Sequence, residues 1–143
     1  MAGHTATAQV EVAAPPARVW EALTDPRLVA AYMFGTVVET DWRPGGVITW
    51  KGEFNGTAYE DHGTVLDAQP GRRLSVTHFS PLTGQPDVPE NYHTLTYELT
   101  ALGDGTLVAL TQDNAASEEE AEHSAANWRT MLAAMKDVAE RAE

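Results

Sequence analysis

The sequence predicts an α+β fold in which a curved antiparallel sheet closes around one long C-terminal helix. Apolar residues recur at three- and four-residue steps through residues 117–142, so they form a single stripe on a helix. Most upstream segments instead alternate apolar and polar residues between turn signals, as strands with one buried face do. A stripe this long must be buried, and these strands are the surface that the chain offers to cover it.

Length and composition fit one domain over residues 1–143. The chain is 43% hydrophobic, and a domain of this size buries roughly two thirds of the surface of its unfolded chain. The absence of cysteine excludes disulfides and thiolate sites, and it is compatible with the cytoplasmic location that we expect. The first residues lack the features of a signal peptide, and no apolar run approaches the roughly 20 residues of a membrane span. The acidic net charge of -12 disfavours nucleic acid and anionic membranes as partners.

The first part of the chain predicts a strand followed by two short helices. Residues 5–12 alternate small apolar and polar side chains, as a strand with one wet face does. A proline pair ends this strand, and apolar residues at helical spacing then continue to Leu23. Asp25-Pro26 fits the cap and first position of a second helix, which ends before Gly35.

Six further strands are expected before the final helix. Turn residues separate them, and Asn55-Gly56 is the strongest hairpin signal. Residues 80–91 contain too many prolines for a strand, so they predict a loop. The expected strands are 36–41, 47–54, 57–68, 73–79, 92–101 and 106–113.

The final helix has a predicted start and two different halves. Ser117 and Glu120 fit a capping box, in which the hydroxyl accepts a backbone N–H and the carboxylate reaches back. The apolar stripe carries only alanine and serine in its first turns and bulky side chains from Trp128 onward. Small residues either let a neighbouring element approach closely or leave room for a pocket, and the sequence leaves both open.

Sequence motifs spread over nearly the whole chain indicate a family. They are Pro15-x-x-x-Val19-Trp20-x-Ala22-Leu23-Thr24-Asp25-Pro26, Met33-Phe34-Gly35, Arg43-Pro44-Gly45-Gly46-x-Ile48-x-Trp50, Gly63-x-Val65, Leu74, Gly105-Thr106 and Trp128. Together they resemble the START-like (SRPBCC) superfamily, and within it the AHSA-like branch, named after an activator of a heat-shock-protein ATPase. The resemblance implies a helix-grip fold with a hydrophobic pocket between the long helix and the sheet, gated by the second short helix.

The chain departs from the usual pattern of that family at four positions. Tryptophan is common at the positions of Met33 and His78, histidine at that of Gln112, and glycine at that of Asn127. These changes put polar atoms where relatives often have aromatic ones.

His78 and Gln112 are the candidate polar groups of a site. Strand alternation places both on the inner face, where a polar group needs a partner. They either orient a carbonyl or hydroxyl of a ligand, or they bond to each other or to water. His78 is also a candidate for a catalytic acid or base, but a weak one, since it has no evident partner. His62 and His123 are expected to be solvated.

Aromatic and methionine side chains complete the candidate site. Apolar walls with a few polar groups are what a small-molecule pocket requires, although the same side chains would also build a core. No histidine spacing fits a metal site, and no nucleotide-binding motif is present, so we expect no metal and no cofactor. The candidate ligand-binding residues are Met33, Phe34, Trp50, Phe54, Tyr59, His78, Tyr97, Gln112, Trp128, Met131 and Met135.

Three functions are compatible with this sequence. The first is a soluble monomer or homodimer that binds a hydrophobic or aromatic small molecule, such as a lipid or a polyketide-like compound. The second, which the resemblance implies, is an enzyme similar to polyketide cyclases and dehydratases, in which His78 would act as acid or base. The third is an interaction domain like the chaperone-ATPase activators.

Overall fold

The computed structural model describes residues 3–33, 35–54, 56–81 and 84–141 and confirms the predicted α+β fold. Seven strands form one antiparallel sheet, and two short helices and one long helix accompany it. The strands are β1 (His4–Val12), β2 (Val37–Glu39), β3 (Val47–Phe54), β4 (Thr57–Gln69), β5 (Arg73–His78), β6 (His93–Leu102) and β7 (Gly105–Ala115). The helices are α1 (Pro16–Thr24), α2 (Pro26–Tyr32) and α3 (Glu118–Glu140).

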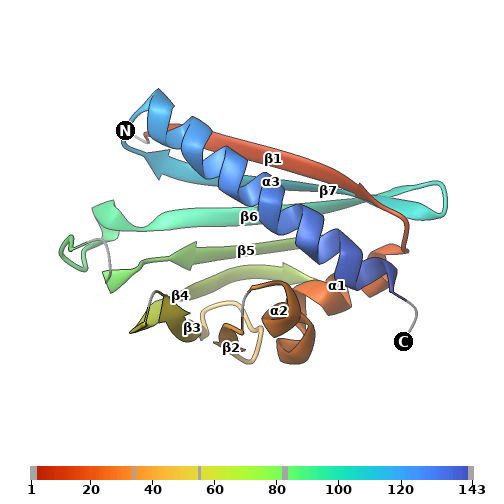
Figure 1. The fold of residues 1–143 in the computed structure, drawn as a ribbon, viewed down its shortest axis with the longest axis horizontal. Helices are drawn as coiled ribbons and strands as arrows, with labels where there is room; N and C mark the ends of the chain where they lie inside the picture. Colours follow the sequence, from red (N-terminus) through yellow and green to blue (C-terminus); the bar gives the residue numbers. More distant parts are fainter. Residues whose placement is uncertain (1–2, 34, 55, 82–83, 142–143) are drawn as a thin grey trace.

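The sheet has the order β1-β7-β6-β5-β4-β3-β2, so its first two strands in the chain form its two opposite edges. The two short helices carry the chain from one edge to the other. Figure 1 shows α3 lying obliquely across one face of the sheet, from the edge with β1 toward α1 and α2. All the other connections join neighbouring strands of the sheet, which is why the pairing is antiparallel throughout.

Side chains near the predicted positions cap the start of α3. The hydroxyl of Ser117 accepts the backbone N–H of Glu120 at 3.1 Å, as a capping box requires. The carboxylate of Glu120 reaches back to the backbone N–H of Ala116 at 2.9 Å, one residue earlier than in a standard box. Orphan N–H groups at this helix end are therefore satisfied from inside the chain.

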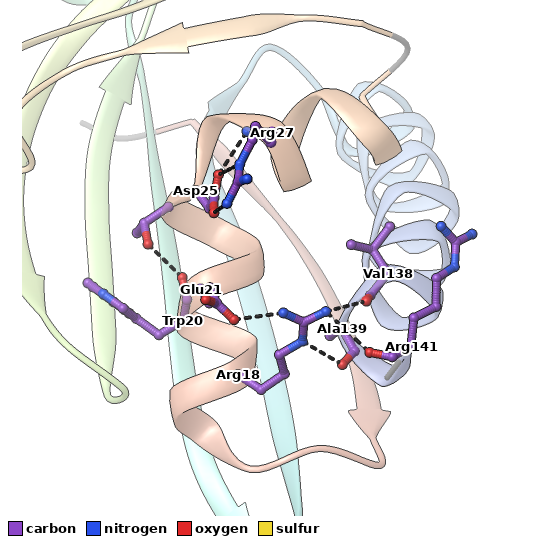
Figure 2. Close-up of polar contacts among 9 residues, drawn as sticks. Arg18, Trp20, Glu21, Asp25, Arg27, Val138, Ala139 and Arg141 are labelled. Atoms are coloured by element: carbon purple, nitrogen blue, oxygen red, sulfur yellow. Dashed lines mark hydrogen bonds and ion pairs between the residues drawn. The ribbon is translucent and has the colours of Figure 1, made fainter. Parts of the chain in front are cut away.

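The guanidinium of Arg18 on α1 holds the other end of α3. Its Nε donates to the carbonyl of Ala139 at 3.1 Å, and its Nη2 donates to the carbonyls of Val138 and Arg141 at 3.3 Å each. Its Nη1 donates to the carboxylate of Glu21 at 2.7 Å, as Figure 2 shows. A positive charge at the negative end of the helix dipole, bonded to its last carbonyls, fixes α3 against α1.

The small residues in the first turns of α3 allow a close approach to the sheet. Ala121 and Ala125 pack with Ala6 of β1 and Ala115 of β7 in a small buried cluster. The bulky half of the stripe belongs to the main core, in which the side chain of Leu132 is fully buried. None of the helices in the described part of the chain is long and apolar enough to cross a membrane.

The loop before β6 is bound to the outer face of the sheet, so the prediction that His62 is merely solvated is wrong. Nε2 of His62 lies 2.9 Å from the carboxylate of Asp87 and 3.0 Å from the hydroxyl of Tyr92. The hydroxyl of Tyr92 donates to Asp87 at 2.6 Å, and its ring stacks on Phe79 with centroids 5.2 Å apart. A short 3-10 helix, η2 (Pro89–Asn91), leads from this loop into β6.

A methyl group at Gly63 would test how tightly β4 and β5 pack. A Cβ built there would overlap the backbone carbonyl of Thr77, which cannot rotate away. We expect Gly63→Ala to lower the free energy of unfolding by about 3 kcal/mol in urea denaturation. At Gly52 the Cβ would meet only the end of the Tyr59 side chain at 2.6 Å, which can move. Gly52→Ala is therefore the matched control, and we expect it to lower the free energy of unfolding by less. Equal losses would contradict this account.

Removing the charge of Asp87 should lower the pKa of Tyr92. The hydrogen bond from its hydroxyl to Asp87, helped by partial burial, raises the pKa of Tyr92 from 10.0 to about 12. This raised pKa stabilises the fold below about pH 10, and the contribution is lost as the pH rises through 12. We expect Asp87→Asn to bring the pKa of Tyr92 back toward 10, measured by tyrosinate absorbance. Asp104→Asn, in an exposed turn, is the control and should change nothing; identical titrations of all three proteins would refute the assignment.

Candidate functional site

A cavity of about 90 Å³ lies between α2, the middle of α3 and the inner face of the sheet. Side chains from α1, α2, strands β2 to β6 and α3 form its wall, so elements from nearly the whole chain contribute. The wall is mostly aliphatic and aromatic, with a few polar groups among them. This composition is typical of a small-molecule site.

Six of the eleven candidate ligand-binding residues line this cavity. They are Met33, Trp50, Tyr59, His78, Tyr97 and Trp128. Phe34 and the side chain of Phe54 lie outside the described residues.

The other three candidates are not part of the cavity wall. Met135 is fully buried in the main core, and Met131 packs against that core from a partly exposed position. Gln112 is buried behind the wall, where it contacts Trp128. Helical and strand periodicity gave the correct inner face for all three side chains, but it does not give the position of the cavity along that face.

The most polar part of the wall is a pair that the sequence analysis missed. Nε2 of His78 on β5 lies 2.9 Å from Oδ2 of Asp61 on β4. The ring of Trp50 meets the imidazole edge-on, with centroids 5.0 Å apart. His78 therefore has a partner that the sequence did not reveal, and this partner is Asp61 rather than Gln112. Strand alternation places Asp61 on the same inner face as Tyr59, two residues earlier. This pattern is the signal in the sequence that could have identified Asp61 as part of the site.

One oxygen of this carboxylate is left without a partner. Oδ1 of Asp61 is buried and has no hydrogen bond to any of the described residues. An unpaired buried carboxylate oxygen is costly, by about 1–3 kcal/mol or more. Because Asp61 lines the cavity, a donor placed there could satisfy this oxygen.

Three tyrosine hydroxyls add further polar atoms to the wall. The hydroxyls of Tyr59 and Thr36 share a hydrogen bond of 2.6 Å. Burial raises the pKa of Tyr97, and it raises the pKa of Tyr32 with an added contribution from Tyr97. The hydroxyls of Tyr32 and Tyr97 thus remain protonated at neutral pH and can act as hydrogen-bond donors.

Gln112 lies outside the cavity wall and holds the ring of Trp128, which is part of that wall. Its Oε1 accepts the indole N–H of Trp128 at 2.6 Å, and only 8% of its surface is exposed. Its Nε2 lies 3.5 Å from Nδ1 of His93, which is itself 2.9 Å from the carbonyl of Asp113. Nδ1 of His93 must donate to this carbonyl, so it cannot also accept from Gln112, and only the amide oxygen of Gln112 is engaged, by Trp128. Gln112 therefore acts on the cavity only through the ring of Trp128.

A second tryptophan in the wall, Trp42, was also missed. It lies in the loop between β2 and β3 with a φ of 59°, a left-handed conformation that is rare for a bulky residue. Two hydrogen bonds hold this loop. The backbone N–H of Trp42 donates to the hydroxyl of Thr40 at 3.3 Å, and the backbone N–H of Arg43 donates to the carboxylate of Asp41 at 3.0 Å. Such strain costs about 1–3 kcal/mol and is often found at binding sites.

Among the described residues, no group of three or more histidine or carboxylate side chains is arranged to hold a metal ion. The side chains of the cavity wall offer one carboxylate–imidazole pair, tyrosine hydroxyls and aromatic faces.

A sheet wrapped around a C-terminal helix, with an apolar cavity between them, defines the helix-grip class of proteins. The family model described as "Activator of Hsp90 ATPase homolog 1-like protein" matches residues 13–140, and the chain belongs to this family. The family resemblance inferred from the sequence motifs is thus confirmed. Among proteins with curated descriptions, none matches the chain.

Several solved structures are similar to this one. ChR145 from Cytophaga hutchinsonii is 50% identical, with a TM-score of 0.85 over 96% of this chain and 94% of its own. CalU16 from Micromonospora echinospora is 24% identical, with a TM-score of 0.74 over 94% of this chain and 75% of its own. The Aha1 dimer from Colwellia psychrerythraea is 20% identical, with a TM-score of 0.73 over 96% of both chains. The last two similarities concern the fold alone.

Proposed function

We propose that this protein binds a small aromatic molecule that carries a hydrogen-bond donor, with the ring in the cavity and the donor on Asp61. The observation that supports this most directly is the unpaired, buried Oδ1 of Asp61 in an otherwise apolar wall. A phenol or an aromatic amine has both an apolar face that packs on this wall and a donor for the unpaired oxygen. Since His78 bonds to the other carboxylate oxygen, it orients Asp61 rather than the ligand directly.

The size of the cavity limits the ring system. A cavity of about 150 Å³ holds a benzene molecule, whereas drug-sized ligands occupy roughly 300–1,000 Å³. The cavity here has about 90 Å³, so a single ring fits after small shifts of the wall. Flexible Met33 at the end of α2 is the side chain best suited to make room.

Binding should depend on the donor of the ligand and on the charge of Asp61. We expect p-cresol to bind at least about tenfold more tightly than p-xylene, because a hydrogen bond to a charged group is worth roughly 1.5–3 kcal/mol. Asp61→Asn should reduce this preference, measured by calorimetry or by tryptophan fluorescence, since Trp50 lines the cavity.

The matched control for this experiment is Asp104→Asn, which makes the same substitution in the exposed turn between β6 and β7. It should keep the preference of the unmodified protein. Equal affinities for p-cresol and p-xylene would refute the role of Asp61, and no binding of either compound would refute the proposed function.

An acid–base enzyme acting in the same cavity is the second candidate, and the Asp61–His78 pair is the observation that favours it. With Nε2 directed at the carboxylate, Nδ1 of His78 is the nitrogen left to accept a proton from a substrate. A histidine oriented by a carboxylate is a common general base. The protonated hydroxyls of Tyr32 and Tyr97 could then stabilise a developing enolate oxygen.

Proton exchange on a phenyl ketone tests this second candidate. In D2O, the enzyme should exchange the α-protons of phenylacetone at least about 100-fold faster than buffer, followed by NMR. His78→Gln should abolish this excess, because glutamine keeps the hydrogen bond to Asp61 but cannot take up the proton. His4→Gln, at an exposed position on β1, is the control. Exchange no faster than in buffer would rule out this reaction.

A further inference from the structure

A second hollow, a groove of about 460 Å³, lies beside the cavity and opens to solvent. It is formed by the first turns of α3, the loop before β6, and the adjoining ends of β6 and β7. His93, Gln112 and Ser124 are among its lining residues, and none of these three lines the cavity. Both hollows therefore lie between α3 and the sheet, but different residues line them.

The side chains of Trp128 and Gln112 lie where the two hollows meet. On α3, Trp128 lines the cavity and Ser124, one turn earlier, lines the groove. On β6, Leu95 lines the cavity and His93, two residues earlier on the same face, lines the groove. Gln112 pairs with Leu95 across the ladder and accepts the indole N–H of Trp128 at 2.6 Å.

We propose that Trp128, held by Gln112, is a movable partition, and that the groove is a second subsite for the polar end of an elongated ligand. This inference rests on the proposed function, because the ring of the same ligand occupies the cavity. When the indole turns away, cavity and groove become one site whose volume falls within the usual range for small-molecule pockets. Trp128 and Gln112 then set the size of ligand that the protein admits.

Geometry and charge indicate what the second subsite takes. The groove begins about one helical turn, roughly 6 Å, from the cavity, so a hexyl chain on the ring is long enough to reach it. Two exposed carboxylates, Glu90 and Glu120, contribute to its wall together with the histidines His93 and His123. The whole chain also carries a net charge of -12. A polar end with hydrogen-bond donors or a positive charge, such as an ammonium group, therefore fits this groove.

Movement of the Trp128 ring requires one identified hydrogen bond to break. The indole N–H must leave Oε1 of Gln112, which loses one hydrogen bond until the ligand is in place. Ligands confined to the cavity do not need this step, whereas elongated ligands do. The bond between Trp128 and Gln112 thus affects the two kinds of ligand differently, and this difference can be measured.

Four probes and three variants test the proposal. The probes are p-cresol, 4-hexylphenol, 4-(6-aminohexyl)phenol and 6-(4-hydroxyphenyl)hexanoic acid. Gln112→Leu removes the acceptor, and Trp128→Phe removes the donor from the other side. Thr111→Val is the matched control, since it lies next to Gln112 on β7 with its side chain on the opposite face of the sheet.

Stopped-flow fluorescence gives the association rate of each elongated probe relative to that of p-cresol. We expect this ratio to rise about fivefold in Gln112→Leu and Trp128→Phe and to stay unchanged in Thr111→Val. In the unmodified protein the amine should bind at least about tenfold more tightly than the carboxylate. An unchanged ratio in both variants would refute the partition, and a lack of preference for the amine would refute the assigned subsite chemistry.

A measurement without any ligand gives an independent check. Exchange of the indole N–H of Trp128 with solvent, followed in 15N–1H spectra, should be slow in the unmodified protein and faster in Gln112→Leu. Equal exchange in both would overturn the partition even if the ligand data agreed.

Failure of p-cresol to bind would refute the proposed function itself, whereas binding of p-cresol but of no elongated probe in any variant would refute only the second subsite.

Discussion

The structure depends on burial of the apolar stripe of α3, and the two ends of this helix are held in different ways. At the first turns, Ala121 and Ala125 let the helix lie close to β1 and β7. At the last turn, Arg18 bonds to the terminal carbonyls and fixes the helix against α1. Between these points a straight helix spans a curved sheet, so its middle stands away from β4 and β5. The cavity lies in this gap, and Trp128 is the side chain of α3 that lines it.

The polar groups of the cavity oppose this apolar packing. Burial of the Asp61–His78 pair with one carboxylate oxygen unpaired lowers stability, and so does the left-handed backbone of Trp42. Aliphatic side chains in place of Asp61 and His78 would give a more stable core. Retained polar groups and local strain at one place in an otherwise well-packed domain are typical of a site adapted to bind something.

Most of the fold could be predicted from the sequence, because its signals are local. Alternation located the strands, turn residues located their ends, and the cap at Ser117 located α3. The same alternation placed His78 correctly on the inner face. Which side chains meet across elements could not be predicted, because this depends on the register of β4 against β5 and on the height of α3 above β7. For this reason the partners Asp61 of His78 and Gln112 of Trp128 emerged only from the structure.

The pairing of β1 with β7 also constrains how the chain can fold. The first strand forms an edge and has the last strand as its neighbour, and roughly ninety residues separate them in sequence. At a synthesis rate of roughly 5–20 residues per second, β1 waits about 5–20 s on the ribosome before its partner exists. During this interval the edge of β1 is unpaired, and its apolar face, including Ala8 and Val12, stays uncovered until α3 follows β7. Completion of the sheet is therefore a late event, and the nascent chain is open to association with other chains until β7 and α3 have emerged.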